Sequence, residues 1–159
     1  MSIERRLHEL RTSLINGLTP LGEFTYIPCR RTGNLVFVSG QVPRRDFNGK
    51  LELIVGKVGS TCDLAAGKAA ARLCGVSLLS VLRDFIGDLD KVTSVVKVDG
   101  FVNCVDSFED HPLVINGCSD FLVEVFGKEI GSHARAAVGC SSLPRGVPVE
   151  VAAIFEIRD

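Results

Sequence analysis

The first residues of the chain repeat their apolar positions at helical intervals, with arginines on the other faces. This pattern predicts an amphipathic helix within residues 1–18 that packs on the rest of the domain. Glu4 and Glu9 argue against a transit peptide, because such peptides avoid acidic residues. The apolar positions of this helix are Ile3, Leu7, Leu10 and Leu14.

Strand-like alternation follows, and it predicts a β-hairpin with strands over 24–29 and 35–39. Next comes a loop over 40–50, in which Asn48-Gly49 is a strong turn signal, and then a short strand over 51–55. Two adjacent basic pairs, Arg30-Arg31 and Arg44-Arg45, are expected in solvated turns or in loop salt bridges.

Two long helices and three further strands complete the pattern. Ser60 offers an N-cap for a helix that runs to Gly87, and Pro112 opens a second helix that runs to Gly127. The remaining strands are predicted over 92–103, 134–140 and 147–157.

This order of elements predicts a single α+β domain over residues 1–159, with a mixed sheet and both long helices on one of its faces. The last strand supports this arrangement, because every second residue from Val147 to Ile157 is apolar and suits the helices. Its other side is half apolar and half acidic, which suits a subunit interface better than solvent. That side carries Glu150, Ala152, Ile154 and Glu156.

The composition is consistent with an oligomer and argues against nucleic acid and membranes as partners. The 159 residues are 46% hydrophobic, and the mean hydropathy of +0.27 is high for a small monomer. A net charge of -1 gives no attraction to nucleic acid or to an anionic membrane. Charges interrupt the apolar runs before they reach the roughly 18–20 residues of a membrane span.

The six cysteines show no C-x-x-C spacing, so we expect reduced core thiols, no metal site and a cytoplasmic protein. Phosphate-loop chemistry is excluded at Gly56-Lys57 and Gly67-Lys68, because Val58 and Ala69 stand where a Ser or Thr hydroxyl is needed.

The last two strands carry the candidate chemistry. If they form a hairpin with Cys140 opposite Val147, Ala137 lies opposite Glu150, and Arg135 and Glu150 share the uncovered face about 7–8 Å apart. A guanidinium there can clamp a carboxylate, and a nearby carboxylate can deprotonate water. From the spacing alone a structural salt bridge is favoured over a site, because cross-strand pairs of Arg and Glu are common.

Five stretches of the sequence, in order, resemble the RidA/YjgF family, also called the endoribonuclease L-PSP family. The resemblance implies a chorismate-mutase-like fold, assembled as a homotrimer with its sheets inside and with sites in the clefts between subunits. The stretches are RTGNLVFVSGQVP at 31–43, GDLDKVTSVVKVDGFVN at 87–103, INGCSDFLVEVFG at 115–127, HARAAVG at 133–139 and LPRGVPVEVAAI at 143–154.

The resemblance also implies roles for single residues. Arg135 matches the arginine that anchors a substrate carboxylate, and Glu150 matches the glutamate that orients the attacking water. Tyr26 matches a tyrosine whose hydroxyl reaches a neighbouring subunit's site. The expected substrate-binding set is Arg135, Ser39, Gly40, Ala137 and Phe101, where Ala137 replaces a cysteine that deaminating members often carry.

The implied activity is hydrolysis of small 2-imino or enamine acids to 2-oxo acids and ammonia, without a metal or cofactor. Because it lacks this cysteine and has an added N-terminal helix, the chain is similar to a less characterised, YjgH-like branch of the family. A trimeric protein that only binds small carboxylates is therefore the alternative. Ribonuclease or translation-inhibitor activity ranks third, because the net charge gives it no support.

Overall fold

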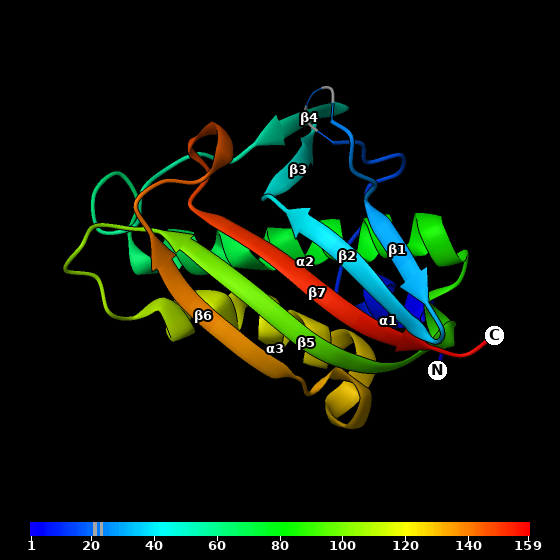
Figure 1. Ribbon diagram of the computed structural model, residues 1–159. Coiled ribbons are helices and arrows are strands. Elements are labelled where there is room, and N and C mark those ends of the chain that lie inside the picture. Colours follow the sequence, from blue (N-terminus) through cyan, green and yellow to red (C-terminus); the bar gives the residue numbers. More distant parts are fainter. Residues whose placement is uncertain (21, 23) are drawn as a thin grey trace.

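The computed structural model describes residues 1–20, 22 and 24–159 of the chain. It is a two-layer α+β domain in which one five-stranded mixed sheet carries the helices on one face (Figure 1). The helices are α1 (Ile3–Glu9), α2 (Leu64–Ile86) and α3 (His111–Gly131), with 3-10 turns at Leu89–Lys91 and Pro144–Gly146. The strands are β1 (Cys29–Thr32), β2 (Leu35–Gln41), β3 (Arg44–Phe47), β4 (Lys50–Leu53), β5 (Val92–Asn103), β6 (Ala134–Cys140) and β7 (Val149–Ile157).

The sheet has the strand order β1-β2-β7-β5-β6, so β5 lies between the last two strands of the chain. Strand β6 pairs with β5 in parallel, while β5 and β2 both pair with β7 in antiparallel fashion. The predicted hairpin between 134–140 and 147–157 is therefore wrong, although both segments are strands. The segment between them is long enough for the chain to pass β5 before it enters the sheet.

Both long helices cover the same face of the sheet, as the alternation of β7 predicts. Helix α2 packs over β2 and β7, and α3 packs over β5 and β6 (Figure 1). The two helices come close together at Gly117, where a Cβ atom would collide with the carbonyl oxygen of Lys68. The helix-facing residues of β7 are almost fully buried, and they are Val149, Val151, Ala153, Phe155 and Ile157.

Helix α2 is, within the described part of the chain, the only helix long and apolar enough to cross a membrane. Its position explains that composition, because 61% of its apolar stretch is buried inside the protein. All six cysteines are free, and four of them are buried, as expected for core thiols.

Several predicted boundaries differ from the structure. The N-terminal helix ends at Glu9, because Arg11 adopts a left-handed backbone conformation with φ 51°. The N-cap of α2 is Asp63, three residues after the predicted Ser60, and its side chain accepts a hydrogen bond from the Ala66 amide. Helix α3 continues past Gly127, where the backbone departs from helical geometry, to Gly131.

The segment around the predicted loop 40–50 also differs. Residues 24–28 lie outside any strand, whereas β3 and β4 form a separate hairpin. The Asn48-Gly49 turn is confirmed: both residues have positive φ, which a two-residue hairpin turn of this kind requires.

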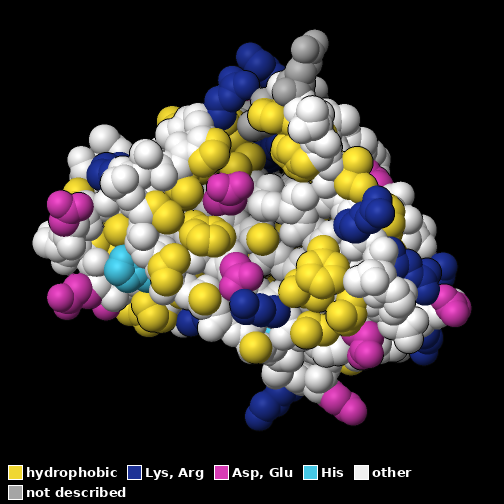
Figure 2. All heavy atoms as spheres, in the orientation of Figure 1, with side chains coloured by type: hydrophobic (Ala, Val, Ile, Leu, Met, Phe, Trp, Pro, Cys, Tyr) yellow, Lys and Arg dark blue, Asp and Glu magenta, His cyan; other side chains and the backbone are white. Residues whose placement is uncertain are grey.

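None of the helices and strands that the structure describes covers the opposite face of the sheet. Figure 2 shows this face, on which hydrophobic side chains gather over the strands with acidic groups among them. Phe37 and Val138 are 41% and 47% exposed there. This is a large apolar share for a solvent-facing sheet surface, and it is consistent with burial against another protein surface.

Candidate active site

Arg135 and Glu150 do not share a face of the sheet, which corrects the prediction made from the assumed hairpin. In the parallel register, Arg135 is paired with Val98, a fully buried residue on the helix-covered face. In the antiparallel register, Glu150 is paired with Phe101 on the open face. The two side chains are thus two strands apart and point to opposite sides of the sheet.

Arg135 is held at the edge of the sheet by polar groups of α3. Its Nη1 donates to Asn116 Oδ1 at 2.8 Å and to Ser119 Oγ at 3.1 Å, and its Nη2 donates to the Pro112 carbonyl at 3.4 Å. The side chain is half-buried and forms no ion pair with the acids that the structure describes. This guanidinium is therefore oriented by neutral partners and keeps its full charge for an anionic group.

His133 extends this network, which we call the Arg135 cluster (Asn116, Ser119, His133 and Arg135). Its Nδ1 donates to the Gly131 carbonyl at 2.6 Å, so in the neutral ring Nε2 accepts from the Ser119 hydroxyl at 2.9 Å. Burial lowers the pKa of His133, and the positive charge of Arg135 lowers it further, against the raising effect of the Gly131 carbonyl. The cluster thus holds a neutral histidine beside the arginine.

Glu150 lies in a separate cavity of about 320 Å³ at the end of β7. Half of this carboxyl group is buried, and burial raises its pKa above the ordinary value. A raised pKa makes the carboxylate a stronger proton acceptor. The cavity is lined by Phe24, Tyr26, Gly40, Val42, Arg44, Pro144, Arg145 and Glu150, which we call the Glu150 cavity.

Gly40 leaves the space that the Glu150 side chain occupies. A Cβ atom on Gly40 would collide with Glu150 Oε1 and would lie 3.2 Å from Glu150 Cγ. The neighbouring Ser39 donates its hydroxyl to the Ile27 carbonyl at 2.9 Å, which ties β2 to the segment that carries Tyr26. The S-G pair of the sequence thus shapes the cavity wall.

The structure divides the predicted site residues into two groups. Tyr26, Gly40 and Glu150 line one cavity; Ser39 lies next to Gly40, and Phe101 is the strand neighbour of Glu150. Arg135 and Ala137 belong to the helix side of β6, where Ala137 packs against the core.

Three functional candidates were missed by the sequence interpretation. Asn116 and Ser119 lie three residues apart on α3, and their polarity among apolar neighbours is the signal that could have found them. Arg44 was expected in a solvated loop, but it is buried in the cavity wall, whereas Arg45 does form the expected surface ion pair with Glu52 at 3.1 Å.

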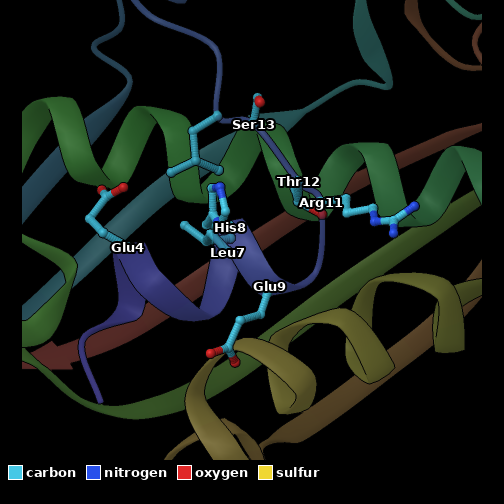
Figure 3. A pocket seen from close by; sticks show the side chains of 8 residues that line it. Glu4, Leu7, His8, Glu9, Arg11, Thr12 and Ser13 are labelled. Atoms are coloured by element: carbon cyan, nitrogen blue, oxygen red, sulfur yellow. The ribbon is translucent and has the colours of Figure 1, made fainter.

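A larger groove of about 730 Å³ lies beside α1, but it lacks convergent chemistry. Figure 3 shows its polar side chains, among them Glu4, His8, Glu9 and Arg11, pointing in different directions instead of toward one point. Across residues 1–20, 22 and 24–159, no three His, Cys, Asp or Glu side chains are grouped so that they could hold a metal ion.

A family model described as "YjgF/chorismate_mutase-like, putative endoribonuclease" matches residues 7–152, which is most of the chain. The chain belongs to the YjgF family. Its mixed sheet with two covering helices is therefore the chorismate-mutase-like fold that the sequence motifs implied.

Other YjgF-like proteins resemble this one over almost the full length. The chain is 38% identical to Protein TCP17 of Trypanosoma cruzi over 157 residues, covering 99% of this chain and 95% of that protein. The crystal structure of Atu1372 from Agrobacterium tumefaciens, a protein of unknown function, shares 42% identity with a TM-score of 0.85, covering 99% and 94% of the two chains. A "putative endoribonuclease" of Shewanella oneidensis MR-1 shares 29% identity with a TM-score of 0.89, covering 99% and 100%.

Proposed function

We propose that this YjgF protein hydrolyses small 2-imino or enamine acids to 2-oxo acids and ammonia. The observation that carries the proposal is Glu150, a half-buried carboxyl group with a raised pKa in a cavity that Tyr26 and Gly40 help to form. The oriented guanidinium of Arg135 supports it, because such a group binds the carboxylate that every 2-imino acid carries.

We further propose that each site forms between two copies of the chain. One chain presents the Arg135 cluster and the Glu150 cavity on different surfaces, so a small acid cannot contact both within that chain. A neighbouring copy that packs along the exposed edge of β6 can bring its own Glu150 cavity to Arg135. Contacts between unlike surfaces close into rings, and the family resemblance implies a ring of three with the apolar sheet faces inside.

The chemistry needs only these groups and water. Arg135 of one copy binds the substrate carboxylate, and Glu150 of the next copy accepts a proton from water while the water oxygen bonds to the imine carbon. The C=N electron pair moves to nitrogen, and Glu150 returns the proton there, which gives the neutral carbinolamine. Glu150 then takes the hydroxyl proton and passes it to nitrogen as the C=O bond forms and the C–N bond breaks, so that ammonia leaves with both protons of the water.

A protein that binds small carboxylates without turning them over is the second candidate. Ala137, which replaces the cysteine common in deaminating relatives, favours it. Endoribonuclease activity, after which several relatives are described, ranks below both because the net charge of -1 gives no attraction to RNA. A cytoplasmic location stays a prediction from the cysteine content.

The test is the rate of 2-oxo acid formation from 2-iminobutanoate that an amino-acid oxidase generates in the assay. We expect wild type to exceed spontaneous hydrolysis and Glu150→Gln to return to it. Glu156→Gln is the matched control, because Glu156 is an exposed glutamate on the same face of β7. Equal rates with and without the protein, over imines of graded side-chain size, would reject the activity and leave the binding function.

A further inference from the structure

Arg44 is the least expected charge in the Glu150 cavity. It is the first residue of β3, and only 6% of it is exposed, whereas the following Arg45 is solvent-exposed and paired with Glu52. Nη1 of Arg44 donates to the Thr19 carbonyl at 2.9 Å. Its Nε is buried and has no hydrogen-bond partner within residues 1–20, 22 and 24–159.

This guanidinium also has no counter-ion among the residues that the structure describes. None of their carboxylates forms an ion pair with Arg44, Glu150 included. Burial lowers the pKa of Arg44, although an arginine still remains charged at neutral pH. A buried charge without a counter-ion is destabilising on its own, so an anion in the cavity would stabilise it.

Only part of the guanidinium is left for a ligand. Nη1 donates to the Thr19 carbonyl and Nε is enclosed by the protein, so Nη2 is the donor that can form a charge-assisted hydrogen bond to a carboxylate in the cavity. The cavity that Arg44 shares with Glu150 and Tyr26 has a volume of about 320 Å³, at the lower end of small-molecule sites. It therefore suits a short acid better than a large ligand.

We propose that Arg44 binds a second carboxylate, at the side-chain end of the substrate, so that the substrate class is a 2-imino or enamine dicarboxylic acid. This inference rests on the proposed function, because it places the reacting carbon near Glu150 with the first carboxylate on Arg135 of the neighbouring copy. Arg44 is then a specificity-determining residue, since a substrate with an apolar side chain would leave its charge unpaired.

The test compares binding of two product-like acids that differ only at the far end, 2-oxoglutarate and 2-oxopentanoate, by titration calorimetry. Wild type is expected to bind 2-oxoglutarate about 10- to 100-fold more tightly, as one charge-assisted contact allows. Arg44→Met should lose this preference, and Arg44→Lys should keep part of it. Arg45→Met, at the adjacent exposed arginine, should keep all of it.

The outcomes separate this inference from the proposed activity. Equal affinity of wild type for the two acids, no binding of 2-oxoglutarate, or a preference that persists in a folded Arg44→Met protein would overturn the inference. Inorganic phosphate that competes as well as 2-oxoglutarate would overturn the assignment to a carboxylate. A preference that depends on Arg44 in a protein that hydrolyses no imine would uphold the dicarboxylate site and reject the deaminase.

Discussion

The Arg135 cluster and the Glu150 cavity differ in how their surroundings act on the charged group: one fixes its direction, and the other shifts its pKa. Arg135 lies at a sheet edge, and neutral side chains of α3 fix its direction through hydrogen bonds. Glu150 lies in a cavity wall with Phe24 and Val42, and partial removal of water raises its pKa. In the proposed reaction the difference corresponds to two tasks: a group that binds a carboxylate needs a fixed direction, whereas a raised pKa makes a carboxylate a stronger proton acceptor.

Mutations in the Glu150 cavity and in the Arg135 cluster, the two halves of the proposed site, should therefore change different kinetic constants. Glu150→Gln should lower kcat by about 10²- to 10⁴-fold with little change in KM, because it removes the proton acceptor. Arg135→Ala should act mainly on KM and lower kcat/KM by about 10- to 100-fold, because it removes a charge-assisted contact. Steady-state kinetics on one imine measures both, and the same split between kcat and KM in the two variants would contradict the division of tasks.

Gly40→Ala tests the cavity half without changing a charge. The added Cβ must displace the Glu150 carboxylate, so we expect a 10- to 100-fold loss of kcat, as for a misplaced catalytic group. The carboxylate is the flexible end of its side chain and can turn into the cavity, so the thermal midpoint should hardly change. Full activity in Gly40→Ala would show that the position of Glu150 is unimportant for the reaction.

Ser119→Ala tests the orienting half with a smaller expected effect. It removes the hydroxyl that links His133 to Arg135, while Asn116 still accepts from the same guanidinium. One neutral hydrogen bond lost should raise KM by about 2- to 10-fold and leave kcat unchanged. A fall in kcat with unchanged KM would mean that Ser119 takes part in the chemical step instead.

The pH dependence of stability should have opposite signs in the two halves. The raised pKa of Glu150 makes the free energy of unfolding fall as pH rises from its ordinary value through the raised one, because the unfolded chain has already lost that proton. The lowered pKa of His133 makes the free energy rise with pH up to the ordinary value of 6.5.

Urea unfolding at a series of pH values measures both changes in the free energy of unfolding. Glu150→Gln should remove the decrease of this free energy with pH, and His133→Gln should remove the increase. Profiles that match wild type in both variants would contradict the local environments assigned to these groups.

Periodic patterns in the sequence predicted the layers of the fold well. The alternation of β7 identified its buried face, and Gly87 and Pro112 marked helix ends correctly, because these signals are local. The pairing of β6 was not predictable in this way. A short loop favours a hairpin locally, but β5 pairs with both strands, and that choice depends on burial across the whole sheet.

The candidate site shows the same limit. Family motifs singled out Glu150 and Arg135 as candidates, but the predicted placement of one beside the other followed from a register that the sheet does not have. Arg44 was missed because the burial of an arginine in a short hairpin is decided by distant residues such as Thr19, which no local pattern reveals.

The most direct test of the shared site is complementation between two impaired variants, measured at a substrate concentration far below the KM of either. Arg135→Ala and Glu150→Gln chains, co-expressed and purified as mixed assemblies through two different tags, should recover about a third of the wild-type rate of imine hydrolysis. In a mixed ring of three, one site in about three receives an intact Arg135 from one copy and an intact Glu150 from the other. Mixed assemblies that stay as slow as both parents would contradict a site built from two copies.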